Sequence, residues 1–280
     1  MFPRSVQPRR TAVLMLCLLA ACGGGEAAAP TSGDVAGEAP AAVDLRLEPR
    51  RVERIQEDCT RQEGDTACTR IILEYPAVTG ESPAVPVVRR WIEAHLLATL
   101  GEGGTAADTE AMVKDFLEEN RAFREEFPDA PGTWAVERKI TVLFQNPRIL
   151  SLVAEDYSYT GGAHPLMVEI LGSFDLQQGH PLVLADLLKP GFEEPVTALA
   201  EAELRRVREI APEADLVAEG FFLEDGFRLT DNFAVVADGL RFYYNPYDIG
   251  PYVMGSTDLT IPLTALQPWI AEDSPLGSLR

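Results

Sequence analysis

Residues 134–159 read WAVERKITVLFQNPRILSLVAEDYSY, and this stretch decides the fold. Apolar and polar residues alternate over 134–144 and again over 148–159, with Asn146-Pro147 between the two runs. A period of two is typical of β-strands, and an Asn-Pro pair is typical of a turn. The stretch therefore predicts an antiparallel hairpin, to which residues 166–176 add a third strand.

Helical periodicity surrounds this hairpin in the sequence. Residues 87–100, 109–127 and 195–210 place apolar side chains three or four positions apart, and Asp108 or Thr109 supplies an N-cap for the second of these helices. Further elements are expected as strands at 44–55, 67–75 (ended by Pro76), 227–230, 233–236, 240–244 and 257–263, and as a short helix at 264–270. Strand clusters apart from the helices indicate an α+β fold with antiparallel sheets, segregated helices and two small subdomains that divide near residue 165.

The composition is that of a globular and strongly acidic chain. Of 280 residues, 46% are hydrophobic, and 24 basic residues against 44 acidic ones give a formal net charge of −20. Such a chain lacks the cationic surface that nucleic acid requires, so no nucleic-acid partner is expected. With three histidines and four cysteines in all, we expect neither a metal site nor another cofactor.

The first 22 residues have the layout of an export signal. Arg4, Arg9 and Arg10 precede the apolar run 11–21, which is too short to span a membrane. The run ends in LAAC at residues 19–22, which resembles the lipobox of bacterial lipoproteins. Residues 1–22 are therefore predicted to be a lipoprotein signal peptide and lipobox. Cys22 is the predicted lipidation site and membrane anchor, carrying a diacylglyceryl group and an amide-linked acyl chain such as palmitate.

The lipobox predicts where the protein lies. Gly23 follows Cys22 where many Gram-negative bacteria use Asp to retain a lipoprotein in the inner membrane. We expect an exported protein, lipid-anchored in the cell envelope, and facing the periplasm from the outer membrane if the source is Gram-negative. A cleaved signal with an incidental cysteine is the alternative.

Residues 23–43 are rich in Gly, Ala and Pro and contain no basic residue, so they are predicted to form a disordered tether. Once the signal and Cys22 are set aside, Cys59 and Cys68 remain, nine positions apart around the Gly64-Asp65 turn. Because exported cysteines are normally oxidised, a structural disulfide between them is expected. A reactive dithiol is the alternative.

Three further segments carry a family resemblance. Residues 157–165 read YSYTGGAHP, 174–187 read FDLQQGHPLVLADL, and 239–252 read GLRFYYNPYDIGPY. In this order they resemble a family of bacterial envelope proteins that pairs a PdaC-type (DUF4163-like) domain, named from a peptidoglycan deacetylase, with a DUF3298 domain. The same pair forms the outer part of lysozyme-sensing anti-sigma regulators. The resemblance implies a PdaC-type α+β domain over 44–164 and a DUF3298-type α+β domain over 165–280.

Two activities of the family are not carried over to this chain. The deacetylases use a separate catalytic domain with a metal-binding Asp and a paired H-x-x-x-H, whereas His95, His164 and His180 have no such spacing. The regulators have a cytoplasmic anti-sigma segment, whereas only ten residues precede the apolar run here. What the resemblance implies is the exported module alone.

The 157–165 loop supplies the first candidate binding residues. Gly161 and Gly162 allow a tightly shaped loop because glycine adopts positive φ, and His164 lies at its tip beyond Tyr157 and Tyr159. Such a histidine could bind a glycan, accept a proton or meet a partner. Alternatively, it caps the turn by bonding to the backbone.

A second candidate set lies in the aromatic stretch near the C-terminus. Its binding candidates are Tyr244, Asn245, Tyr247, Asp248 and Tyr252. Sugar rings stack on aromatic faces and carboxamides bond hydroxyl groups, so a glycan platform is one interpretation; packed tyrosines at the edge of a sheet are the other. Asp156 and Asp175 could form a carboxylate pair, although their separation in sequence does not place them together.

The sequence therefore favours a lipid-anchored envelope protein with a non-catalytic binding role. Its expected ligand is cell-wall glycan (peptidoglycan) or a cationic protein such as a lysozyme-like hydrolase, since the acidic net charge attracts cations. Catalysis is left open: the alternative is a peptidoglycan-modifying hydrolase or deacetylase-like enzyme, which would need His164 near a carboxylate or a metal. A purely structural component is a third interpretation.

Overall fold

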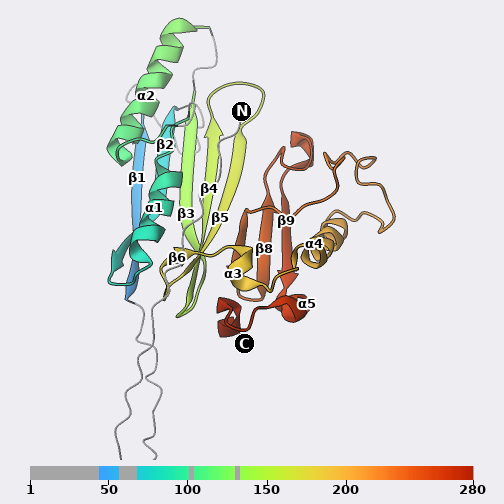
Figure 1. Cartoon of the computed structure of the whole chain (residues 1–280). Coiled ribbons are helices and arrows are strands. Elements are labelled where there is room, and N and C mark those ends of the chain that lie inside the picture. The colour runs from blue at the N-terminus through green and yellow to red at the C-terminus, as the bar shows by residue number, and fades with distance from the viewer. Residues whose placement is uncertain (1–43, 57–67, 101–103, 130–132, 280) are drawn as a thin grey trace, which may run out of the picture. The chain divides into compact units, whose positions relative to one another are not determined.

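The computed structural model describes residues 44–56, 68–100, 104–129 and 133–279. Its strands are β1 (Leu45–Ile55), β2 (Arg70–Gly80), β3 (Ala135–Gln145), β4 (Ile149–Tyr159), β5 (Leu166–Asp175), β6 (His180–Pro181), β7 (Phe233–Val236), β8 (Gly239–Tyr244) and β9 (Thr257–Pro262). Its α-helices are α1 (Val85–Leu96), α2 (Thr109–Glu126), α3 (Leu184–Leu187), α4 (Glu193–Val207) and α5 (Leu263–Leu266). Two sheets with segregated helices confirm the predicted α+β class (Figure 1).

The first sheet has six strands in the order β1-β2-β3-β4-β5-β6. The predicted hairpin is its centre, because β3 pairs antiparallel with β4, and β4 with β5. One pair departs from the expected antiparallel pattern: β2 and β3 run parallel, since α1 and α2 form the crossover between them. The apolar sides of both helices pack with one face of this sheet, and Asp108 caps α2 by accepting a hydrogen bond from Ala111 N at 2.8 Å.

The parallel pairing of β2 and β3 is short. Its register ends at Glu74–Lys139, beyond which β2 continues with β1 alone and β3 with β4 alone. The expectation that Pro76 ends the strand is therefore wrong. Past Glu74 the side of β2 towards β3 is a free edge, which is the position in a sheet where proline is tolerated.

The second sheet has the order β7-β8-β9 and is antiparallel throughout. α4 packs along β9 and buries Val196, Ala200 and Leu204. The strand expected at residues 227–230 is absent from this part of the structure. The Arg228 carbonyl there accepts a hydrogen bond from the Tyr244 hydroxyl instead of pairing with a neighbouring strand.

Two asparagine side chains next to the strands of the second sheet, Asn232 before β7 and Asn245 after β8, bond the exposed edge of β5 in the first sheet. Asn232 Oδ1 accepts a hydrogen bond from Leu171 N at 2.7 Å, and its Nδ2 donates to the carbonyls of Glu169 and Tyr243. Asn245 makes a two-point contact with the backbone of Glu169, at 2.8 and 3.0 Å. These amides satisfy the β5 backbone where no further strand pairs with it.

The predicted division near residue 165 falls between β4 and β5, which are neighbours in one sheet. The two domain boundaries stay predictions. None of the helices in the described part of the chain has the length and apolar character needed to cross a bilayer.

Candidate functional site

The two loops singled out in the sequence meet. The His164 and Tyr252 rings stack with their centroids 3.7 Å apart and their planes 16° apart. The Tyr252 hydroxyl donates to the Pro165 carbonyl at 2.7 Å, and the Tyr247 ring lies 5.8 Å from the Tyr252 ring. His164 and Tyr247 are exposed and Tyr252 is half-buried. We refer to His164, Tyr247 and Tyr252 as the aromatic surface.

Backbone geometry presents His164. Gly161 and Gly162 adopt φ values of 98° and 100°, where a side chain would be strained, and they turn the chain out of β4. Tyr159, the last residue of β4, donates its hydroxyl to the Gly162 carbonyl at 3.2 Å. His164 Nδ1 lies 3.0 Å from the Pro165 carbonyl, so in the neutral ring the proton is on Nδ1 and Nε2 is left as an acceptor.

The opposite loop is held by its own polar contacts. Asn245 N donates to Asp248 Oδ2 at 2.7 Å, which closes the turn over residues 245–248. Tyr247 within this turn has φ 76°, a left-handed conformation that costs a non-glycine residue about 1–2 kcal/mol. Its side chain is nonetheless 54% exposed. The fold thus holds a large aromatic ring in solvent at an energetic cost, a feature that clusters at functional sites.

The other candidates in this loop have structural contacts. Tyr244 is buried, and burial raises the pKa of its hydroxyl, which donates to the Arg228 carbonyl. Asn245 uses its carboxamide on the backbone of β5. Tyr157 lies on β4 opposite Met167, two residues before Tyr159 and on the same face of the strand.

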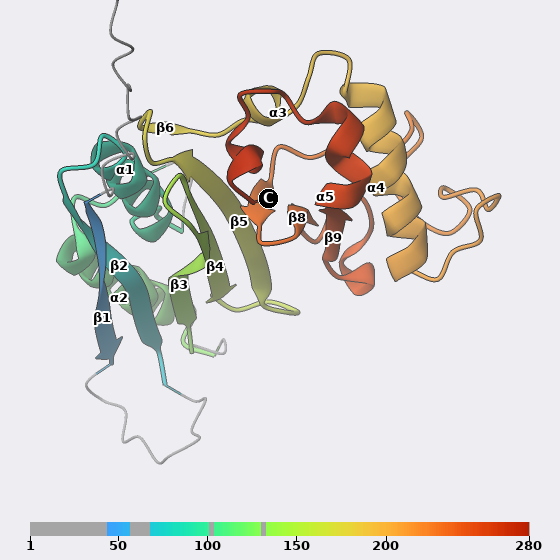
Figure 2. The same cartoon turned by 90° about the horizontal axis from the view of Figure 1, so that it is seen from below.

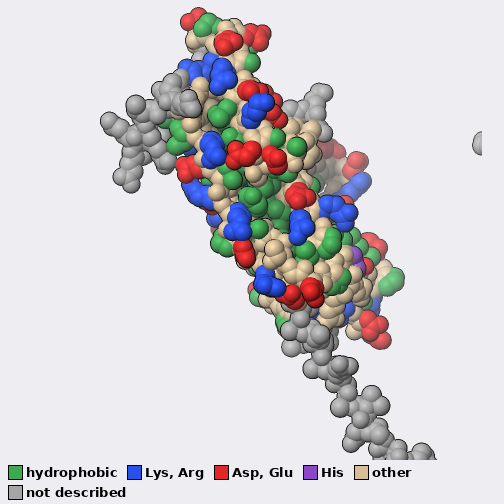
Figure 3. Space-filling model, turned by 90° about the vertical axis from the view of Figure 1, so that its left-hand side faces the viewer, with side chains coloured by type: hydrophobic (Ala, Val, Ile, Leu, Met, Phe, Trp, Pro, Cys, Tyr) green, Lys and Arg blue, Asp and Glu red, His purple; other side chains and the backbone are tan. Residues whose placement is uncertain are grey.

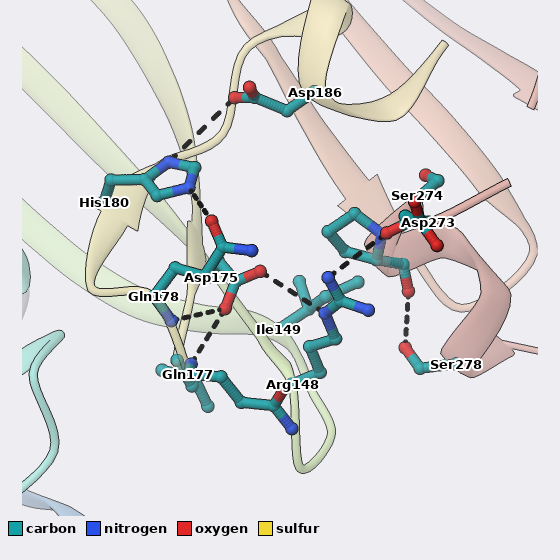
Figure 4. Close-up of polar contacts among 12 residues, drawn as sticks. Arg148, Ile149, Asp175, Gln177, Gln178, His180, Asp186, Asp273, Ser274 and Ser278 are labelled. Atoms are coloured by element: carbon teal, nitrogen blue, oxygen red, sulfur yellow. Dashed lines mark hydrogen bonds and ion pairs between the residues drawn. The ribbon is translucent and has the colours of Figure 1, made fainter. Parts of the chain in front are cut away.

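Asp156 and Asp175 do not form a pair. Asp175 is opposite Ile149 on the β4–β5 ladder, and Asp156 lies seven positions further along β4, about 23 Å away at strand spacing. Asp175 is buried and accepts from the backbone N–H groups of Gln177 and Gln178 and from Arg148 Nε at 3.3 Å (Figure 4). Glycosidase carboxylates lie about 5–10 Å apart, so this arrangement does not suit them.

The three histidines occupy separate elements. Burial, followed by the charge of Arg138, lowers the pKa of His95, whose ring packs edge-on against Trp91 at 4.4 Å. His180 lies 4.0 Å from Asp186 and 3.0 Å from Gln178 Oε1, and it is the one histidine paired with a carboxylate in the described segments (Figure 4). Within these segments, no three His, Cys, Asp or Glu side chains are grouped to hold a metal.

The structure has a cavity beside residues 244–249 that the sequence did not predict. It measures about 440 Å³, and Phe222, Leu229 and Ile249 are among the apolar residues that line it. Glu224, Asp225, Asp248 and Arg228 are its charged residues, and Tyr244 contributes as well. Of the sequence candidates, this acidic cavity therefore includes Tyr244 and Asp248.

Some predictions fall on residues that the structure does not describe. These are the signal peptide with Cys22, the tether at residues 23–43, and Cys59. Cys68, directly before β2, is buried. The lipid anchor and the Cys59–Cys68 disulfide stay predictions.

Two family models match this chain. The model of the deacetylase PdaC family matches residues 62–167, and the model described as a protein of unknown function, DUF3298, matches residues 185–264. The chain therefore contains a PdaC-type domain followed by a DUF3298 domain.

A curated relative agrees with the match to the PdaC model. Peptidoglycan-N-acetylmuramic acid deacetylase PdaC of Bacillus subtilis is 23% identical over 166 residues, which is 58% of this chain and 34% of that protein. The match thus spans about a third of the length of that relative.

Two solved structures share the fold. A DUF3298 family member from Bacteroides fragilis has a TM-score of 0.66 at 23% identity, over 85% of this chain and 99% of that one. A DUF3298 family protein from Pseudomonas aeruginosa has a TM-score of 0.62 at 21% identity, over 81% and 95% respectively. At these identities the likeness concerns the fold alone.

Proposed function

We propose that this protein is a lipid-anchored cell-envelope protein that binds the glycan of the cell wall without catalysis. The observation that carries the proposal is the aromatic surface, in which His164, Tyr247 and Tyr252 from two distant segments meet in solvent. The likeness to a peptidoglycan deacetylase supports a cell-wall ligand.

The chemistry of the aromatic surface suits a sugar. The apolar C–H face of a pyranose packs on an aromatic ring, and a tyrosine hydroxyl can bond a sugar hydroxyl. His164 adds Nε2 as an acceptor beside the rings. No ion pair joins His164 to a carboxylate among the residues described, so the arrangement favours binding over acid–base chemistry.

The position of the aromatic surface agrees with a tethered protein. Ile55 pairs with Arg70, Arg70 with Ala135, and Ala135 with Tyr159. The loop after Tyr159 therefore lies at the end of the sheet opposite Leu45, about 33 Å away at strand spacing (Figure 1). This end of the sheet is therefore the one farther from residue 44, where the described chain begins.

Co-sedimentation of the purified full-length protein with peptidoglycan sacculi tests the proposal. Tyr252→Ala removes the ring on which His164 stacks, and we expect the affinity to fall by about tenfold, as for a central aromatic contact. Tyr252→Phe keeps the ring but loses the bond to Pro165, and should retain most of the binding.

Val253→Ser is the matched control, because Val253 is the neighbouring residue and is 90% exposed. It should sediment like the unmodified protein. Failure of the unmodified protein to sediment with sacculi, or full binding by Tyr252→Ala, contradicts the proposal.

A cationic protein is the second candidate ligand. The acidic cavity carries three carboxylates, from Glu224, Asp225 and Asp248, against the single guanidinium of Arg228. Phe222 in its lining is 51% exposed, so the cavity offers both charge and apolar area to a lysine or arginine side chain of a partner.

A further inference from the structure

The six-stranded sheet is split along part of its length. Beyond Glu74 and Lys139 the ladder between β2 and β3 ends, while both strands continue. In Figure 2, β1 and β2 form one group of strands, and β3, β4 and β5 form the next. The edge of β3 that faces β2 is therefore free of a neighbouring strand from Ile140 onward in the described chain.

A groove of about 440 Å³ occupies this split and is lined by residues of β1, β2 and β3. Its apolar lining includes Leu47, Tyr75, Pro76, Ile140 and Val142. Hydrophobic side chains gather in the middle of the face drawn in Figure 3, with charged side chains around them. We refer to this site as the fork groove.

Among the residues that line the fork groove, cations outnumber carboxylates, whereas the chain as a whole is acidic. Its lining contains the cations Arg50, Arg51 and Lys139 and the single carboxylate of Glu74, whereas the chain has a net charge of −20. Arg51 pairs with Glu74 and Glu53, and Arg50 with Glu48 at 2.8 Å. Lys139 is held more loosely, at 3.9 Å from Glu155, and its side chain is more than half exposed.

We propose that the fork groove binds an extended acidic peptide. The backbone of the peptide pairs with the free edge of β3, its apolar side chains pack on Tyr75 and Val142, and its carboxylates lie against Arg51 and Lys139. An edge presents N–H and C=O groups at strand spacing, and an extended chain is the ligand whose own groups repeat at that spacing. Because cations outnumber carboxylates among the lining residues, the groove favours acidic residues in the peptide.

This site is separate from the aromatic surface and goes beyond the proposed function. The aromatic surface follows Tyr159, the end of β4 that pairs with Ala135. The fork groove instead follows β3 from Lys139 to Val142, nearer its opposite end. Binding at one site can therefore be lost while binding at the other remains.

Calorimetric titration of the purified full-length protein tests the proposal. The probe is an acetylated and amidated five-residue peptide of alternating valine and glutamate, and its glutamine counterpart is the uncharged comparison. We expect the glutamate peptide to bind more tightly, with affinity that falls as salt rises. Arg51→Gln and Lys139→Gln should each weaken it roughly threefold to fivefold, the fold-change of an exposed ion pair.

Arg46→Gln is the matched control, since Arg46 is also an ion-paired arginine of β1 but does not line the groove. It should bind the peptide unchanged. Val142→Asp places a carboxylate in the groove and should abolish binding, whereas Val183→Asp, at another exposed valine, should not.

Several outcomes overturn the proposal. They are absence of binding, equal binding of the two peptides, or equal losses in Arg46→Gln and Lys139→Gln. A concentration-dependent dimer in sedimentation velocity that Val142→Asp dissociates would assign the groove to a second copy of the chain instead, and would also overturn it. Sedimentation with sacculi is unaffected by these results, so the two proposals fail separately.

Discussion

At the scale of single residues, Arg138 joins three elements beneath the helix layer. Its side chain is 4% exposed, and Nε donates to Asp156 Oδ2 at 2.9 Å across the β3–β4 ladder. Its Nη1 donates to the carbonyls of Leu96 and Ala98 at the C-terminal end of α1. A cation at this end of a helix is stabilised by the partial negative charge of the last carbonyls.

Arg138→Ala should therefore lower the free energy of unfolding by about 3–5 kcal/mol, because it leaves Asp156 without its buried partner and frees the carbonyls of α1. Chemical denaturation measures the change. Arg46→Ala, at the exposed pair with Asp44, should leave the free energy of unfolding nearly unchanged. A loss at Arg138 no larger than that of this control would contradict the structural role given to it.

At the scale of elements, the edge of β5 beyond its short pairing with β6 is completed by side chains instead of by a strand. The amides of Asn232 and Asn245 bond the backbone of Glu169 and Leu171, and Ser173 Oγ accepts from Val235 N at 2.9 Å. Edge strands left open invite pairing with other chains. These contacts close that edge and fix the position of the loop that carries Tyr247 and Tyr252.

Asn232→Asp tests the hydrogen bonds between Asn232 and the β5 edge, because the substitution changes the shape of the side chain little. The carboxylate can still accept from Leu171 N, but it replaces the amide donor that bonds two carbonyls and adds a charge beside them. We expect a loss of about 1–3 kcal/mol in the free energy of unfolding. Hydrogen exchange at the Glu169 and Leu171 amides should become faster. Unchanged exchange at both amides would show that the protection of the β5 edge does not depend on Asn232.

At the scale of the whole molecule, net charge acts on an approaching partner over a longer range than any contact does. The DUF3298 segment, residues 185–264, contains 15 acidic and 6 basic residues, a net charge of −9 (6 minus 15). Long-range attraction of a cation accelerates association and is screened by salt. The carboxylates of the acidic cavity are where we expect a cationic side chain of the partner to bind.

If the cavity takes a cationic partner, a lysozyme should bind with an association rate that falls steeply between low and physiological ionic strength, as measured by surface plasmon resonance. Asp225→Asn combined with Glu224→Gln should slow association further. Glu118→Gln combined with Glu119→Gln on α2 provides the control at equal charge. Identical rates for the two double variants would show that net charge alone, and not the cavity, attracts the protein.

The sequence predicted where most helices and strands lie, but it predicted fewer of the contacts between them. Alternation located β3, β4 and β5, and helical spacing located α1, α2 and α4, because each pattern is local. The parallel step between β2 and β3 was missed, since strand direction depends on the path of the crossover. Arg138 was missed as well, although its signal was visible: it is a charge at the apolar-face position between Val136 and Ile140.

For the candidate site as well, the sequence indicated residues but not their contacts. His164, Tyr247 and Tyr252 were named from two motifs 88 positions apart (252 minus 164), but only the folded chain brings them into contact. Asn245 was named for its carboxamide, which could have bonded a sugar and instead bonds β5. Composition alone could not distinguish the two uses, because the same donor and acceptor atoms serve both.

Saturation-transfer NMR with the disaccharide repeat of peptidoglycan tests the central claim most directly. The aromatic surface predicts that the sugar C–H protons receive saturation from irradiated aromatic side chains, and that Tyr252→Ala removes the effect while Val253→Ser leaves it. Transfer of equal strength in Tyr252→Ala, or none in the unmodified protein at millimolar disaccharide, would contradict the binding of cell-wall glycan at His164, Tyr247 and Tyr252.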